Sequence, residues 1–91
     1  MPDRHIRTRI SGRVQGVSYR AWTQENAQEL GLSGWVRNLS GGDVEAVFSG
    51  PDQAVQTMLG RLKQGPRMAQ VSAIDVNEAE GPPPTGFEIT G

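Results

Sequence analysis

A chain of 91 residues with a formal net charge of −1 has the length of one small domain, which we expect to span residues 1–91. With 35% hydrophobic residues and so little net charge, its composition excludes an intrinsically disordered chain. It contains no cysteine, which excludes disulfides, thiolate zinc sites and a cysteine nucleophile. No apolar run approaches the roughly 18 residues that cross a membrane, so we expect a soluble, cytoplasmic protein, acting as a monomer.

Basic residues are concentrated at the start of the chain. The first 20 residues hold five arginines and one aspartate, whereas the remainder is acidic overall. A short basic segment on an acidic body indicates a local anion-binding site rather than a nucleic-acid-binding face.

The first predicted elements are a strand and a helix separated by a glycine-containing loop. Residues 5–10 alternate polar and apolar side chains, which predicts a half-buried strand with Ile6 and Ile10 facing the core. Residues 12–16 interrupt this pattern, and residues 18–30 have a helical pattern that Gly31 ends. The helix face expected to be buried consists of Tyr19, Trp22, Ala27 and Leu30.

A hairpin and a second helix follow. Strands at 34–39 and 44–48 flank a turn at 40–43, whose glycines provide positive φ. A helix begins after Gly50, with Pro51 at its first position, and ends at residues 65–66. Its predicted apolar face consists of Ala54, Val55, Met58, Leu59 and Leu62.

The chain is expected to close with two more strands. Residues 69–76 form the fourth strand, in which Val71, Ile74 and Val76 do not share a period of two, so a β-bulge is expected. A proline-rich loop and a short strand at 87–89 follow. The order βαββαβ with a short extra C-terminal strand predicts an α+β, ferredoxin-like fold, a four-stranded antiparallel sheet with two helices on one face.

The loop between the first strand and the first helix carries the clearest functional signal. Gly12 and Gly16 allow backbone N–H groups to turn inward, and the helix end adds partial positive charge. Arg20 lies about one helical turn further on, and its planar guanidinium suits phosphate oxygens. Together these features describe a site for a phosphate-sized anion. A tight turn between strand and helix with an exposed arginine is the simpler interpretation, and for an arbitrary loop with two glycines it is the favoured one.

Two segments resemble the signature sequences of the acylphosphatase family. Residues 12–20, GRVQGVSYR, are similar to its first block, G-x-V-Q-G-V-x-aromatic-R, and residues 34–38, GWVRN, are similar to its second. The resemblance extends over nearly the whole chain and is least informative at residues 66–85.

This resemblance implies metal-independent hydrolysis of acyl phosphates to a carboxylate and inorganic phosphate, with no cofactor. By position, Arg20 would bind the phosphate and Asn38 would position the attacking water. The phosphate-binding loop would consist of Arg13, Val14, Gln15, Gly16 and Val17. The expected partners are an acyl phosphate substrate and inorganic phosphate as product and inhibitor, with neither nucleic acid nor membrane.

The residue chemistry agrees with this expectation. An asparagine orients a water without deprotonating it, and a carboxylate is a good leaving group, so positioning and charge stabilisation suffice if a phosphate oxygen takes the proton. The single histidine, His5, is expected on the surface of the first strand.

Two alternatives stay open. One is a non-catalytic domain that binds a phosphorylated ligand, for which Asn38 would have no use. The other is an RNA-binding module of the same topology, which stacks bases on aromatic side chains of its first and third strands. The predicted first strand has no aromatic residue and the third has only Phe48, so RNA binding is the weaker alternative.

Overall fold

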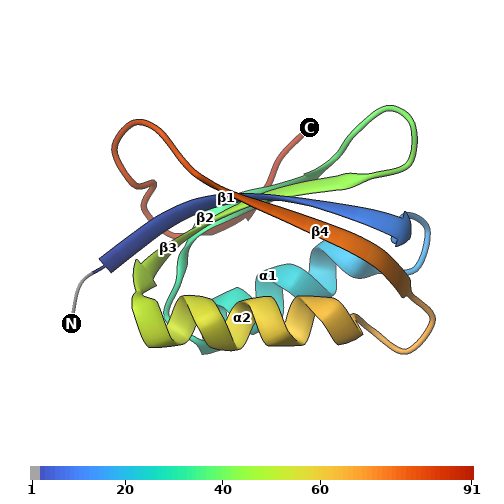
Figure 1. Ribbon diagram of the computed structural model, residues 1–91, viewed down its shortest axis with the longest axis horizontal. Helices are drawn as coiled ribbons and strands as arrows, with labels where there is room; N and C mark the ends of the chain where they lie inside the picture. Colours follow the sequence, from blue (N-terminus) through green and yellow to red (C-terminus); the bar gives the residue numbers. More distant parts are fainter. Residues whose placement is uncertain (1–2) are drawn as a thin grey trace.

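In a computed structural model that describes residues 3–91, a five-stranded sheet is covered on one face by two helices (Figure 1). The elements in chain order are β1 (Asp3–Arg13), α1 (Tyr19–Glu29), β2 (Ser33–Asn38), β3 (Val44–Pro51), α2 (Asp52–Gln64), β4 (Gln70–Glu78) and β5 (Phe87–Ile89). This arrangement confirms the predicted ferredoxin-like fold. Neither helix is long and apolar enough to cross a membrane.

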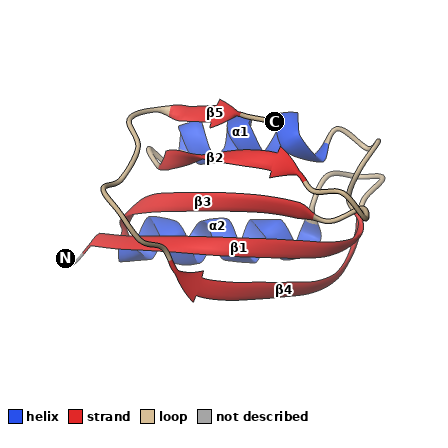
Figure 2. Cartoon of the chain, turned by 90° about the horizontal axis from the view of Figure 1, so that it is seen from above, coloured by secondary structure: helices blue, strands red, loops and turns tan. Residues whose placement is uncertain are grey.

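The strands are arranged in the order β4-β1-β3-β2-β5 (Figure 2). β1 pairs antiparallel with β3 and β4, and β2 pairs antiparallel with β3. The short β5 is parallel to β2, with Val36 opposite Ile89. It therefore extends the sheet beside the strand that carries Asn38.

The core lies between the sheet and the helices, as the period-two alternation of the strands predicts. Ile6 and Ile10 of β1 are fully buried on the helix-covered face. On α2, Val55, Met58 and Leu62 are fully buried and form the centre of the predicted apolar face. The residues predicted at its margins, Ala54 and Leu59, are partly buried.

The buried face of α1 differs in part from the prediction. Tyr19, Thr23 and Ala27 are buried, because residues four apart lie along one stripe of a helix. Trp22 lies at the edge of this stripe, partly buried and 5.5 Å from the ring of Tyr19. Leu30 caps the end of the helix and is also partly buried.

The predicted bulge is present where β1 meets β4. The register shifts between Ser11 and Gly12, so that Ser72 of β4 has no partner on β1. Gly12 has a φ of +124°, and a Cβ there would lie 2.2 Å from the backbone oxygen of Gln70. β1 therefore continues through Gly12 to Arg13, where the sequence predicts a loop, because the glycine allows β4 to approach closely.

The start of α2 also differs from the prediction. Pro51 is the N-cap of the helix and the last residue of β3, rather than the first helical residue. Its ψ of 142° is extended, so the helix begins at Asp52. β3 is correspondingly longer than the predicted strand at 44–48.

Candidate active site

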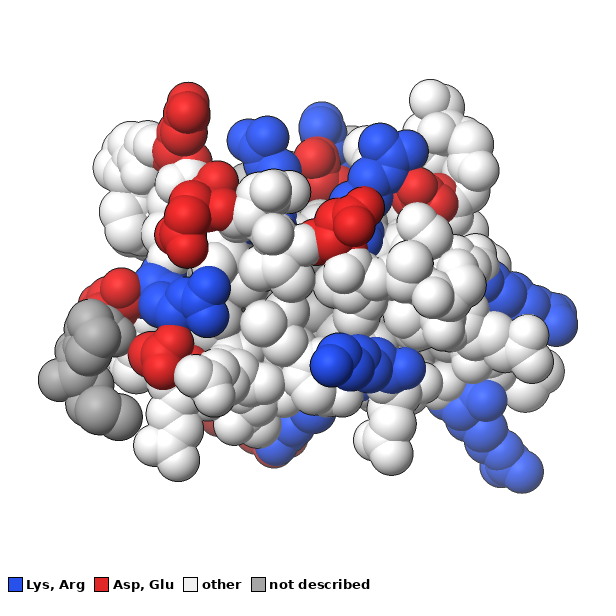
Figure 3. Space-filling view, viewed as in Figure 1, with Lys and Arg blue, Asp and Glu red and all other residues white. Residues whose placement is uncertain are grey.

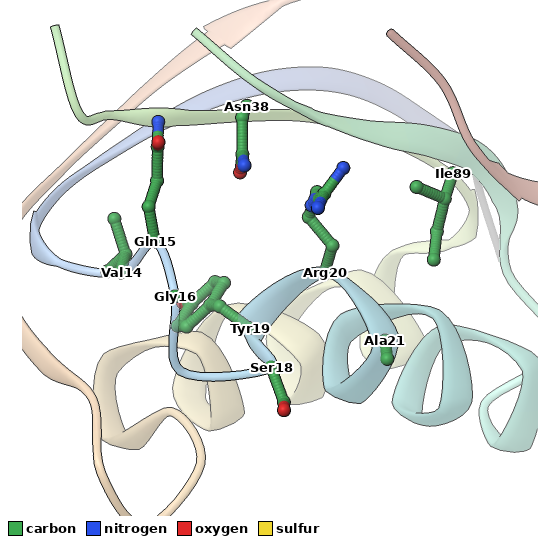
Figure 4. Close-up of a pocket in the computed structure, with 9 residues that line it drawn as sticks. All are labelled: Val14, Gln15, Gly16, Ser18, Tyr19, Arg20, Ala21, Asn38 and Ile89. Atoms are coloured by element: carbon green, nitrogen blue, oxygen red, sulfur yellow. The ribbon is translucent and has the colours of Figure 1, made fainter.

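A cavity of about 230 Å³ brings together residues that are far apart in the sequence (Figure 4). It lies between the loop after β1, the first turn of α1, the end of β2 and β5. Arg20 and Asn38, the two residues for which the sequence predicts the main roles, both face it. The lining consists of Val14, Gln15, Gly16, Ser18, Tyr19, Arg20, Ala21, Asn38 and Ile89.

The loop backbone has two residues with positive φ, Gly16 and Ser18, where it passes the cavity. Gly16 has a φ of +74°, and no atom lies within 4 Å of where its Cβ would be, so glycine is favoured here by conformation and not by space. Ser18, the N-cap of α1, also has a positive φ of 63° and makes no side-chain cap hydrogen bond. Since the first N–H groups of a helix have no partner within it, this helix start is suited to bind an anion.

Arg20 extends from the first turn of α1 across the cavity (Figure 4). None of the five ion pairs found among residues 3–91 involves its guanidinium. By contrast, Arg9 is paired with Asp43 and Arg37 with Glu45. The donors of Arg20 are therefore not committed to a carboxylate of the described chain.

Asn38 is the last residue of β2, and its side chain points into the cavity (Figure 4). Its Oδ1 atom is buried and has no hydrogen-bond partner in the described part of the chain. A buried acceptor left unpaired costs about 1–3 kcal/mol. The cavity thus offers a hydrogen-bond acceptor that a water or a ligand can satisfy.

Gln15 connects the loop to the turn that follows Asn38. Its Nε2 donates to the backbone oxygens of Leu39 and Asp43, at 2.8 Å each. The Asp43 carboxylate accepts a hydrogen bond from Arg9 at 2.7 Å, which raises the pKa of Arg9. Both amide hydrogens of Gln15 are therefore engaged with backbone oxygens rather than directed toward a ligand.

Tyr19 fixes the start of α1 against α2. Its hydroxyl donates to the backbone oxygen of Leu62 at 2.8 Å, and burial raises the pKa of the phenol. The side chain is therefore a neutral donor that holds the helix start, and with it the loop, in place.

The predicted loop of residues 13–17 lines the cavity only in part. Val14, Gln15 and Gly16 line it. Arg13 is the last residue of β1 and exposed, and the side chain of Val17 packs against the core. Neither belongs to the cavity lining.

Four lining residues, Ser18, Tyr19, Ala21 and Ile89, are absent from the sequence-based prediction of the site. The sequence predicts Tyr19 only as a residue of the buried helix face. Ser18 lies inside the signature segment, and its place directly before the helix is the signal that could have identified it. Ala21 is one residue beyond that segment. Ile89 has no such signal, since it reaches the cavity only through the pairing of β5 with β2.

A second cavity, of about 340 Å³, lies near the other end of β1. It is lined in part by His5, whose ring Nδ1 is hydrogen-bonded to Ser49 Oγ. Although larger, it contains none of the predicted site residues. Across residues 3–91, no group of three or more His, Cys, Asp or Glu side chains is placed to hold a metal ion.

Comparison with known proteins identifies the family. The acylphosphatase family model matches residues 6–89. The chain belongs to the acylphosphatase family. It is therefore an enzyme that hydrolyses acyl phosphates, with a carboxylate and inorganic phosphate as products.

Individual family members are similar over most of their length. An acylphosphatase from Rhizobium etli is 47% identical over 87 residues, covering 94% of this chain and 93% of the relative. One from Rhodospirillum rubrum is 52% identical over 79 residues, covering 87% of each. The solved structure of an acylphosphatase from Coxiella burnetii superposes with a TM-score of 0.92 at 36% identity, covering 97% of this chain and 93% of that one.

The geometry of the sheet does not favour the RNA-binding alternative. Phe48 is fully buried against the helices and stacks on Phe87 at 5.5 Å, so it is not available to a base. Along the upper side of the molecule in Figure 3, where the sheet lies, basic and acidic side chains are interspersed. On the sheet, Arg37 of β2 is paired with Glu45 of β3. Such a face lacks the clustered positive charge of a phosphate-backbone footprint.

Proposed function

We propose that acyl phosphate hydrolysis takes place in the cavity between the loop and β2, with Arg20 and the loop binding the phosphate and Asn38 positioning the attacking water. One observation carries this proposal. Asn38 presents a buried, unpartnered oxygen to the same cavity that Arg20 and the anion-binding helix start enclose.

Phosphate binding rests on three sources of positive potential that converge on one place. The loop at Gly16 and the start of α1 supply backbone N–H groups, and the helix dipole adds partial positive charge. Arg20 adds a planar pair of donors that matches two phosphate oxygens. Preorganised donors of this kind stabilise charge that builds up on the phosphate in the transition state.

The attacking water is held by Asn38. A water that donates one hydrogen to Oδ1 directs a lone pair into the cavity, where the phosphorus lies. As the bond from the water oxygen to phosphorus forms, the bond from phosphorus to the acyl oxygen breaks, and its electron pair leaves with the carboxylate. The water proton passes to a phosphate oxygen, so the protein needs no base.

Gln15 acts as a positioning residue in this scheme. Its side-chain amide donates to the backbone oxygens of Asp43 and of Leu39, the residue that follows Asn38, while its own backbone belongs to the loop. Gln15 thereby links the loop that would bind the phosphate to the turn beside Asn38. Misplacing a reacting group by about 1 Å can reduce a rate about 100-fold.

The proposed site also bears on the oligomeric state of the enzyme and on its inhibition by phosphate. The proposed site is complete within one chain, and we expect a monomeric, cytoplasmic enzyme. Because the loop recognises an oxyanion, inorganic phosphate is expected to inhibit in competition with the substrate.

Two substitutions separate the proposed roles. Arg20→Lys keeps the charge and loses the planar pair of donors, so phosphate affinity and turnover should both fall, by about 2–4 kcal/mol in the transition state. Asn38→Ala leaves the positive groups intact, so phosphate affinity should be retained while turnover falls about 100-fold or more. Phosphate titration and hydrolysis of benzoyl phosphate measure both quantities.

Matched controls are Arg7→Lys and Asn77→Ala, which alter exposed residues of β1 and β4 outside the cavity. Both should keep normal turnover, and circular dichroism checks each fold. If Asn38→Ala lost phosphate affinity as severely as Arg20→Lys while keeping its turnover, Asn38 would be a phosphate ligand and not a water-positioning residue.

A further inference from the structure

Ile89 is an exposed apolar residue at the edge of the cavity. Ile89 is 41% exposed. Two other large hydrophobic residues, Val76 and Met68, are exposed to a similar or greater extent, but they do not line this cavity. A single exposed apolar side chain is ordinary on a protein surface. The position of Ile89 is nevertheless informative about substrate binding, because this apolar side chain lies next to the polar groups that we propose bind the phosphate.

The position of Ile89 is determined by contacts on both sides. On one side, β5 pairs with β2, and Thr90 N donates to Val36 O at 2.9 Å. On the other, Gln24 of α1 donates to the backbone oxygen of Phe87 at 3.1 Å. Ile89 is therefore held beside Val36, which lies two residues before Asn38 on β2. The hydrogen bonds on both sides of β5 fix this position.

The cavity has two chemically different ends (Figure 4). Gln15, Gly16 and Asn38, together with Val14 and Tyr19, lie toward one end, whereas only Ile89 and Ala21 border the other, beyond Arg20. The substrate has the same asymmetry, with a charged phosphate joined to an uncharged acyl group. A phosphate held by the loop and Arg20 leaves the apolar end of the cavity to the acyl group.

We propose that Ile89, together with Ala21, forms an acyl subsite that favours larger apolar or aromatic acyl groups over acetyl. This inference rests on the proposed function, because it takes the loop and Arg20 as the phosphate site. Apolar contact with one side chain distinguishes only modestly between substrates with different acyl groups. The difference is smaller at an open cavity edge than in a closed pocket. The expected preference is therefore a matter of several-fold differences in kcat/KM.

The test compares kcat/KM for benzoyl phosphate and acetyl phosphate in Ile89→Thr. Threonine keeps the β-branched shape that suits a strand, but a hydroxyl replaces the ethyl branch of isoleucine. The ratio of benzoyl to acetyl phosphate should fall about three- to tenfold. Inhibition by inorganic phosphate should not change, because phosphate does not reach the subsite.

Two further variants complete the comparison. Val76→Thr makes a similar change at a strand position that is also 41% exposed, outside the cavity, and should leave the substrate ratio as it is. Ile89→Leu keeps an apolar side chain and should keep most of the preference. Equal losses for both substrates in Ile89→Thr, with phosphate inhibition intact, would overturn the subsite alone. If phosphate failed to compete in the unmodified enzyme, the phosphate site would fall, and the subsite with it.

Discussion

Asn38 and Thr23 each bury a side-chain oxygen that has no partner within the described chain. Thr23 lies on the packed face of α1, whereas Asn38 faces a cavity. The same unfavourable feature therefore has different meanings at the two positions. A buried acceptor that opens onto a cavity beside an uncommitted arginine is a place where stability is given up for function.

Gln15→Met tests the positioning role at the residue scale. Methionine has a similar size but no donors, so the loop loses both hydrogen bonds to the turn after Asn38. Turnover should fall about tenfold, within the range that misplacement of a reacting group allows, and phosphate affinity should change less than about threefold. Steady-state kinetics and phosphate titration provide the measurement.

A double-mutant cycle shows whether Gln15 acts through Asn38. In an Asn38→Ala background, Gln15→Met should have little further effect on turnover, because the water is no longer positioned. Gln56→Met is the control, since it makes the same substitution at a glutamine of α2 that donates to Asp52 and does not line the cavity. Additive losses in the cycle, or a loss of phosphate affinity in Gln15→Met, would show that Gln15 does not position Asn38.

At the scale of the elements, α1 contributes Arg20 to the candidate site, and a hydrogen bond to α2 fixes the start of α1. The Tyr19 hydroxyl reaches the backbone oxygen of Leu62, close to the end of α2, where helix carbonyls lack partners within the helix. The first turn of α1 carries both Tyr19 on its buried side and Arg20 on the cavity side. The contact between the helices thus fixes the direction from which Arg20 enters the cavity where we propose that phosphate binds.

Tyr19→Phe should lower the free energy of unfolding by about 1 kcal/mol, because it removes this hydrogen bond. Burial raises the pKa of Tyr19 in the folded state, so its contribution to stability is complete below the unfolded pKa of about 10 and is lost as the pH rises above it. The phenylalanine variant should show a weaker decrease in stability at alkaline pH. Denaturant unfolding followed by circular dichroism at pH 7 to 11 measures it.

The chain has one tyrosine, so its phenolate absorbance reports on Tyr19 alone. In the folded protein it should remain protonated through pH 10 and titrate together with unfolding. A normal titration near pH 10 without unfolding would contradict the buried, hydrogen-bonded state.

At the scale of the whole molecule, the site forms where several chain segments meet at one end of the sheet. β1 ends there, α1 begins there, and β2 reaches its last residue there (Figures 1 and 4). The second cavity lies near the other end of β1 and has a separate set of lining residues. The fold thus joins a helix N-terminus to the end of a neighbouring strand, which is the combination an anion and a water require.

Hydrolysis should not require a metal ion, because Arg20 and the backbone N–H groups supply the positive charge that the phosphate needs. Incubation with EDTA should leave the rate of benzoyl phosphate hydrolysis unchanged, and added Mg²⁺ should not raise it. The control is a metal-dependent phosphatase assayed in the same buffer. Loss of activity with EDTA and its recovery with Mg²⁺ or Zn²⁺ would contradict the proposed chemistry.

The sequence alone determined the element order and most of the core. Alternation along β1 places Ile6 and Ile10 inward, and the stripe of α2 is visible as a helical period, because these patterns depend only on local geometry. The signature segments likewise identified the chemistry and the candidate residues Arg20 and Asn38. Their residue types, a guanidinium and a neutral amide, follow from the sequence itself.

Only the tertiary structure decided how these groups meet. Three features depend on contacts between segments that are distant in the chain. Gln15 binds the turn after Asn38, Arg13 remains in the sheet, and Ile89 borders the cavity. Such contacts follow from strand register and from close approaches, as at Gly12, which local periodicity does not specify. The identity of the proposed catalytic groups is thus local information, whereas their geometry and the shape of the proposed acyl subsite are properties of the packed fold.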